Sequence, residues 1–157
     1  VGRLDSRYKG KDYIVAGERL DTDISSEGFS AAYVSGLHTW LSEIGVNIKR
    51  LYRSGDNDLG KNWDWYSTQS GWPRFVNVAP HIGRAMRENI DFKVYVACGI
   101  YDLATPCFTA TNTIHENGID PGRVKFTEFE GGHMMYNHQP SFDKFLNEVR
   151  DFVKDKE

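Results

Sequence analysis

Two stretches of the chain decide its fold: FKVYVACGIYDLATP at residues 92–106 and VKFTEFEGGHMMY at residues 124–136. The first begins with a nearly continuous run of apolar and β-branched residues, which is typical of a strand buried on both faces in a parallel sheet. The second begins with a shorter run of the same kind. Residues 105–118, which lie between them, are enough for the crossover helix that parallel strands require. We therefore predict an α/β fold in which the two strands are adjacent and parallel.

A polar residue follows each predicted strand. Asp102 comes after the first strand and His133 after the second, 31 positions later, which is the length of one strand–helix–strand unit. The carboxyl ends of parallel strands are where open α/β sheets place their sites. An Asp before a His in the chain is also the order of the α/β-hydrolase triad, in which Asp holds the imidazole and His activates a serine. We expect the two side chains to lie within hydrogen-bonding distance.

The residues around this pair resemble a known family. GIYDLATP at residues 99–106 and FEGGHMMYNHQP at residues 129–140 are similar to the Asp and His motifs of the serine carboxypeptidase family, peptidase family S10, whose fold is the α/β-hydrolase. The resemblance covers residues 76–154 and is vague before them. One departure is Tyr136, where the family usually has Pro three residues after the His.

The resemblance implies roles for single residues and for the two parts of the chain. Asp102 and His133 would be catalytic, and Met134, next to the His, would help to wall the substrate pocket. Residues 1–75 would belong to a partly helical, lid-like insertion that covers the active site. Residues 76–157 would be the C-terminal part of the α/β-hydrolase core.

The residue pattern predicts helices in both parts. Ser25 or Ser26 is expected to cap a helix that runs to about Ile44 and ends at Gly45. In the second part we expect helices over residues 77–89 and 105–118, the latter capped by Thr105, with Pro106 in its first turn and Gly118 at its end. The last helix opens at Pro140, and its apolar side chains follow the i, i+3, i+4, i+7 spacing of one buried face: Phe142, Phe145, Leu146, Val149, Phe152 and Val153.

Each candidate also has a structural interpretation. Asp102 alone could cap a turn, and His133 alone could be a packed histidine, so the pairing of the two favours catalysis. The glycines before His133 are expected to let the backbone turn sharply. Cys107 lies near a helix start, where a thiolate would be stabilised. We interpret it as a buried or substrate-pocket-lining thiol, and we expect both Cys98 and Cys107 to be free.

Composition bounds the function. The net charge of −3 and the pI near 6.0 give no electrostatic footprint for nucleic acid, and the apolar runs are shorter than a membrane span. The acidic groups D-T-D at residues 21–23 and D-N-D at residues 56–58 lack the glycine and terminal Glu of a calcium loop. Residues 54–72, rich in Gly, Asp, Asn and Trp, are typical of a loop. We expect no metal, cofactor, nucleic acid or membrane partner.

The chain contains no G-x-S-x-G nucleophile motif. The first hypothesis is therefore the C-terminal portion of a serine carboxypeptidase-like peptidase, which removes C-terminal residues from peptides with a serine that lies upstream of this chain. Alone, the chain would be inactive, and it would expose an apolar sheet edge or face for the missing N-terminal part or for another copy of itself. The alternatives are another α/β-hydrolase, such as an esterase or aminopeptidase, and a non-catalytic α/β binding domain. The family suggests a secreted or periplasmic location.

Overall fold

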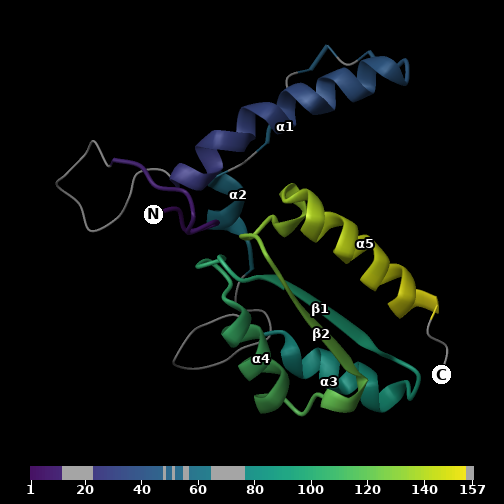
Figure 1. The fold of residues 1–157 in the computed structure, drawn as a ribbon. Helices are drawn as coiled ribbons and strands as arrows, with labels where there is room; N and C mark the ends of the chain where they lie inside the picture. The colour runs from purple at the N-terminus through teal and green to yellow at the C-terminus, as the bar shows by residue number, and fades with distance from the viewer. Residues whose placement is uncertain (12–22, 48, 51, 55–56, 65–76, 155–157) are drawn as a thin grey trace.

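A computed structural model of the chain describes residues 1–11, 23–47, 49–50, 52–54, 57–64 and 77–154. Figure 1 shows their arrangement. In chain order the elements are α1 (Ile24–Glu43), α2 (Asn57–Asn62), α3 (Ala79–Glu88), β1 (Val94–Gly99), α4 (Cys107–Glu116), the 3-10 turn η1 (Pro121–Arg123), β2 (Val124–Phe129), the 3-10 turn η2 (Met135–Asn137) and α5 (Gln139–Lys154).

The centre of the fold is a parallel pair of strands joined by a helix. β1 pairs with β2 from Val94 opposite Val124 to Gly99 opposite Phe129, and α4 lies in the connection between them. This confirms the predicted α/β character and the adjacent parallel strands. The described residues contain two strands, fewer than the three or four that we expected in this chain.

Helices cover both faces of this sheet (Figure 1). One face packs against α3 and α4 in an apolar core of buried and partly buried side chains, which are Ala79, Ile82, Met86, Val94, Val96, Ile114, Ile119, Val124 and Phe126. On the other face, the rings of Tyr95 and Phe129 contact Phe145 of α5, and Tyr95 also contacts Phe152. Alternate residues of each strand point to opposite faces, so the three layers follow from the strand sequences.

Two predicted helix caps are wrong. α1 begins at Ile24 because the carboxylate of Asp23, rather than a serine hydroxyl, caps it and accepts a hydrogen bond from the Ser25 N–H at 2.9 Å. At α4 the N-cap position is Pro106, which has no capping side chain. The Thr105 hydroxyl donates to Asp102 instead. The predicted ends are confirmed, because Gly45 and Gly118 have the left-handed φ values of 77° and 65° that follow a helix.

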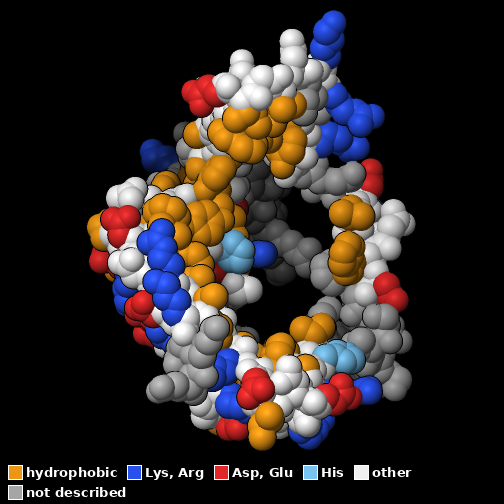
Figure 2. Space-filling view, turned by 90° about the vertical axis from the view of Figure 1, so that its right-hand side faces the viewer, with side chains coloured by type: hydrophobic (Ala, Val, Ile, Leu, Met, Phe, Trp, Pro, Cys, Tyr) orange, Lys and Arg blue, Asp and Glu red, His pale blue; other side chains and the backbone are white. Residues whose placement is uncertain are grey.

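The described residues of the first half of the chain are loosely packed. α1 forms as predicted. Helical spacing places one apolar stripe along it and its C-cap: Phe29, Tyr33, Leu37, Trp40, Leu41 and Ile44. Three of these side chains are exposed: Tyr33 at 46 %, Trp40 at 55 % and Ile44 at 53 %. Hydrophobic side chains gather at the top of Figure 2, the level of α1 in Figure 1, and a hollow lies below them. α2 lies within the segment that we expected to be a loop, whose residues 55–56 and 65–72 are outside the described residues.

No described helix has the length and apolarity that crossing a membrane requires.

Candidate active site

The two strand ends bring Asp102 and His133 together. The Nδ1 atom of His133 lies 2.7 Å from Oδ2 of Asp102, so the expected hydrogen bond is confirmed. Asp102 is buried, with 4 % of its surface exposed, whereas 44 % of the His133 side chain is exposed. The carboxylate is thus shielded behind a ring that solvent and a substrate can reach.

Hydrogen bonds hold the Asp102 carboxylate in its ionised form. Oδ1 accepts from the backbone N–H groups of Ala104 at 2.8 Å and Thr105 at 3.0 Å, and Oδ2 accepts from the Thr105 hydroxyl at 2.6 Å. Burial alone would raise the pKa of Asp102, but the hydrogen bonds from Thr105, His133 and Ala104 outweigh it and keep the pKa below its ordinary value. Thr105 is a site residue that the sequence pattern did not identify, since its hydroxyl resembled a helix cap.

The ionised carboxylate fixes the chemistry of the ring. A carboxylate only accepts hydrogen bonds, so the His133 Nδ1 must carry the proton that is shared with Oδ2. The neutral ring then has its lone pair on Nε2, which can accept a proton from a hydroxyl nucleophile. The pair is therefore arranged as an oriented general base.

The loop that carries His133 lies very close to the end of β1. A Cβ atom at Gly99 would be 2.0 Å from the carbonyl oxygen of Gly132, so only glycine fits there. The Tyr101 N–H also donates to the Gly131 carbonyl at 2.9 Å. Neither Gly131 nor Gly132 has a positive φ. A Cβ atom on Gly131 would be 2.7 Å from Cα of Met135, and one on Gly132 would be 2.3 Å from the Leu4 carbonyl oxygen, so the paired glycines are needed for close approach and not for a left-handed turn.

Residues 3–6, which we call the N-terminal strap, connect the two site loops. The Arg3 carbonyl accepts from the Leu103 N–H at 3.0 Å, and the Ser6 N–H donates to the Tyr101 carbonyl at 2.9 Å, so the strap is bonded on both sides of Asp102. The Leu4 carbonyl accepts from the His133 N–H at 2.6 Å. No local sequence signal marks this segment, because its role depends on contacts about 100 positions away along the chain.

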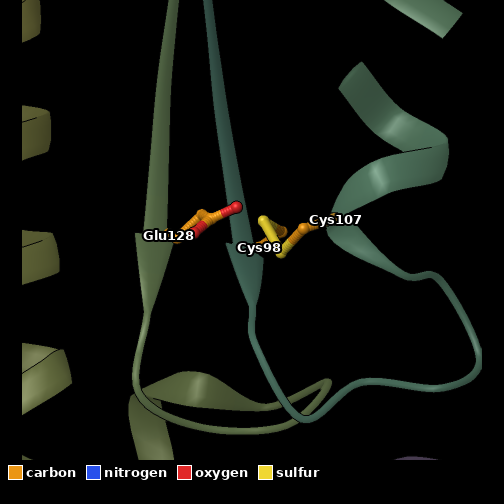
Figure 3. A group of neighbouring side chains, drawn as sticks. All are labelled: Cys98, Cys107 and Glu128. Atoms are coloured by element: carbon orange, nitrogen blue, oxygen red, sulfur yellow. A yellow bond between two sulfur atoms is a disulfide. The ribbon is translucent and has the colours of Figure 1, made fainter. Parts of the chain in front are cut away.

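The expectation of two free thiols is wrong, because Cys98 and Cys107 form a disulfide (Figure 3). The loop after β1 folds back so that Cys107, the first residue of α4, lies over the strand end. The two Cα atoms are 5.5 Å apart, within the range that a disulfide spans. The sulfur of Cys107 is thus bonded to Cys98, and a substrate contact by this residue stays a prediction.

One group of potential metal ligands occurs among the described residues. Cys98, Cys107 and Glu128 place their ligand atoms within 4.8 Å of one another (Figure 3). Metal ions bind thiolates, and the disulfide leaves neither sulfur as a thiolate. In its disulfide form this group offers a single exposed carboxylate and does not make a metal centre.

Met134 lies beside a small cavity next to His133. The cavity has a volume of about 140 Å³ and is lined by Leu4, Asp5, Arg7, Tyr8, Phe29, Met134, Asn137 and His138. It therefore combines apolar walls with polar groups from the strap and from η2. The substrate contact of Met134 stays a prediction, and a substrate that made this contact would lie in this cavity.

A nucleophile is missing from the described part of the site. No serine hydroxyl within the described ranges hydrogen-bonds to His133. Ser26 and Ser30 donate to backbone carbonyls near the start of α1, and Ser141 is bonded to His138 and to the Glu130 carbonyl. Thr105 lies 3.2 Å from Nδ1, on the Asp102 side of the ring, where it cannot use the free Nε2.

Comparison of the chain with protein-family models, with curated proteins and with solved structures finds no match. We therefore infer the function from the geometry of this site and from the sequence motifs that carry it.

Proposed function

We propose that the chain is the C-terminal portion of a serine carboxypeptidase-like peptidase with an α/β-hydrolase fold. The observation that carries this proposal is the 2.7 Å contact between a buried, ionised Asp102 and a partly exposed His133 at the ends of adjacent parallel strands. The substrate would be a peptide, and the third member of the triad, a serine, would lie upstream of Val1.

In the complete enzyme, His133 would act through Nε2. It would accept the proton of the serine hydroxyl during attack on the scissile carbonyl and return it to the leaving amine. Asp102 would hold Nδ1–H and stabilise the imidazolium that forms, while Thr105 would hold Asp102. Met134 would contact the substrate from the neighbouring cavity.

An apolar cavity and an unpaired side of β1 support the proposal that part of the protein is missing from this chain. A cavity of about 360 Å³ lies between α3, α4 and the sheet, and its walls include Val94, Val96, Ile82, Ile114 and Val124. In the described residues β1 pairs on one side only, with β2. Further strands from an upstream segment would extend the sheet beyond β1 and cover apolar surface here, as would a second copy of the chain.

The disulfide fits the location that the family resemblance implies. Disulfides form and persist in oxidising compartments, such as the cell exterior and the periplasm. A secreted or periplasmic peptidase would keep Cys98 and Cys107 joined.

The substrate class is tested with the protein that includes the upstream segment. N-blocked dipeptides with a free C-terminal carboxylate are compared with the same dipeptides as amides, with dipeptides that have a free N-terminus, and with simple aryl esters. The proposal predicts the highest kcat/KM for the blocked dipeptides with a free carboxylate. A preference for dipeptides with a free N-terminus would indicate an aminopeptidase instead. Hydrolysis of esters alone would indicate an esterase.

A further inference from the structure

Asp5 is a buried carboxylate that the proposed reaction does not use. Its exposure is 8 %, and its oxygens accept from the backbone N–H of Arg7 at 3.0 Å, from Nε of Arg7 at 3.0 Å and from Nη2 at 2.7 Å. The Arg7 guanidinium also lies over the Tyr101 ring, 4.8 Å from its centre. This carboxylate is therefore held firmly in one orientation.

The second partner of Asp5 is the loop of the proposed base. The Asp5 side chain lies directly against Gly132, the residue before His133, and the backbone N–H of Gly132 is among the groups that lower the pKa of the Asp5 carboxyl. The next N–H, that of His133, donates to the Leu4 carbonyl at 2.6 Å. A Cβ atom on Gly132 would be 2.5 Å from Cβ of Asp5, so the strap and the loop are in direct contact.

Hydrogen bonds to the start of α1 hold the strap in place. The Asp23 carboxylate accepts from the backbone N–H groups of Arg3 and Leu4, both at 3.0 Å, and the Asp5 N–H donates to the hydroxyl of the fully buried Ser25 at 3.2 Å. The position of Gly132 and His133 is thus tied through Asp5 to a fixed part of the molecule.

We infer that Asp5 is a positioning residue, which holds the Gly132–His133 backbone so that the His133 ring stays aligned with Asp102. This inference rests on the proposed function only where it describes the alignment as catalytic. A displacement of about 1 Å in a catalytic group costs on the order of 10²-fold in rate. Loss of the Asp5 acceptor should therefore lower kcat.

The test compares Asp5→Leu, which removes the acceptor at similar size, with Asp5→Asn, which keeps one oxygen for the Gly132 N–H. Asp120→Leu is the matched control, since Asp120 caps η1 through the Gly122 N–H and has no contact with the site loops. The first readout is the downfield proton signal of His133 Nδ1–H in this chain, assigned by its loss in His133→Gln. Asp5→Leu should lose the signal, whereas Asp5→Asn and Asp120→Leu should retain it.

The second readout is kinetic, in the protein that includes the nucleophile. Asp5→Leu should lower kcat by about 10²-fold, and Asp5→Asn should restore most of that loss. An Asp5→Leu variant that keeps both the ring signal and kcat would overturn the inference. If Asp5→Leu does not fold, Asp5→Ala serves the same comparison. Absence of hydrolysis in the unmodified protein would contradict the proposed function but not the inference about Asp5. The His133 ring signal would still report how Asp5 affects the contact between His133 and Asp102.

Discussion

At the scale of single residues, the site consists of a buried anion surrounded by donors. Asp102 accepts from two backbone N–H groups, from the Thr105 hydroxyl and from the His133 ring, and these bonds overcome the cost of its burial. Hydrogen bonds that involve a charged group are worth about 1.5–3 kcal/mol each. The residue is therefore structural as well as a candidate for catalysis, and its two roles can be separated by pH.

The first prediction concerns the stability of Asp102→Asn at different pH values. The pKa of Asp102 is lower in the folded chain than in the unfolded one, so its carboxylate stabilises the fold above the unfolded pKa, about 3.9. That contribution is lost as the pH falls through the folded pKa. At pH 7 the variant should be less stable by about 1–3 kcal/mol, and the difference should shrink below pH 4. Urea denaturation of both proteins at each pH measures this, and a difference that stays constant with pH would contradict it.

Thr105 gives a second prediction. Thr105→Val keeps the shape of the side chain but removes the hydroxyl that donates to Asp102 at 2.6 Å. The free energy of unfolding should fall by about 1–2 kcal/mol, because a buried carboxylate oxygen loses a donor. Thr105→Ser restores the hydroxyl and should restore most of the stability. Thermal denaturation measures both variants. Equal stability of Thr105→Val and Thr105→Ser would show that the hydroxyl does not stabilise the fold.

At the scale of elements, the structure depends on the end of β1, which meets three other segments within a few residues. Gly99 contacts the His133 loop, Cys98 is bonded to the start of α4, and Tyr101 is bonded to the strap. The loop between Cys98 and Cys107 contains both Asp102 and Thr105. Changes in this connection should therefore alter the site without touching its functional groups.

The disulfide supplies the third prediction. Replacing Cys98 and Cys107 by Ala opens a loop with a sequence separation of 9. Loop-closure entropy gives a loss of about 2–3 kcal/mol in stability for a loop of this size. Thermal denaturation with and without a reducing agent measures the effect: reduction should lower the Tm of the unmodified chain and leave the double variant unchanged. Equal melting of the reduced and oxidised unmodified chain would contradict the assigned bond.

The fourth prediction compares two glycines. Gly99→Ala should be severely destabilising, by about 3 kcal/mol or more, because its Cβ would lie 2.0 Å from a backbone oxygen that cannot move aside cheaply. Gly36, within α1, has nothing within 4 Å of a new Cβ, and Gly36→Ala should stabilise the helix by about 0.5–1 kcal/mol. Chemical denaturation should separate the variants in opposite directions. Similar midpoints for both would refute the close approach.

At the scale of the whole molecule, local pattern predicted the second half of the chain better than the first. The strands, α4 and α5 follow from periodicity, and the Asp102–His133 contact follows from their parallel pairing. The strap and the disulfide could not be predicted in this way, since each depends on where a loop returns in space. For α1 the spacing of apolar residues predicted the helix correctly but not its packing, because Tyr33, Trp40 and Ile44 of its apolar stripe are exposed.

The fifth prediction is that this chain alone does not hydrolyse peptides. Loss of the serine from a triad costs about 10⁶-fold in turnover, and no serine in the described ranges reaches His133. The purified chain should not react with a serine-directed fluorophosphonate probe, and sedimentation should show that it binds the upstream segment or itself. Labelling of a serine within these 157 residues, together with turnover, would refute the proposed division of the triad.

If Asp102 and His133 are two members of a serine triad, hydrolysis must depend on His133. The protein that includes the upstream segment is assayed on a blocked dipeptide with His133 intact and as His133→Ala, with His115→Ala, a change at an exposed histidine of α4, as the control. We predict that His133→Ala lowers kcat by about 10⁶-fold and abolishes fluorophosphonate labelling, while His115→Ala retains both. Hydrolysis that continues unchanged in His133→Ala would show that His133 is not the base.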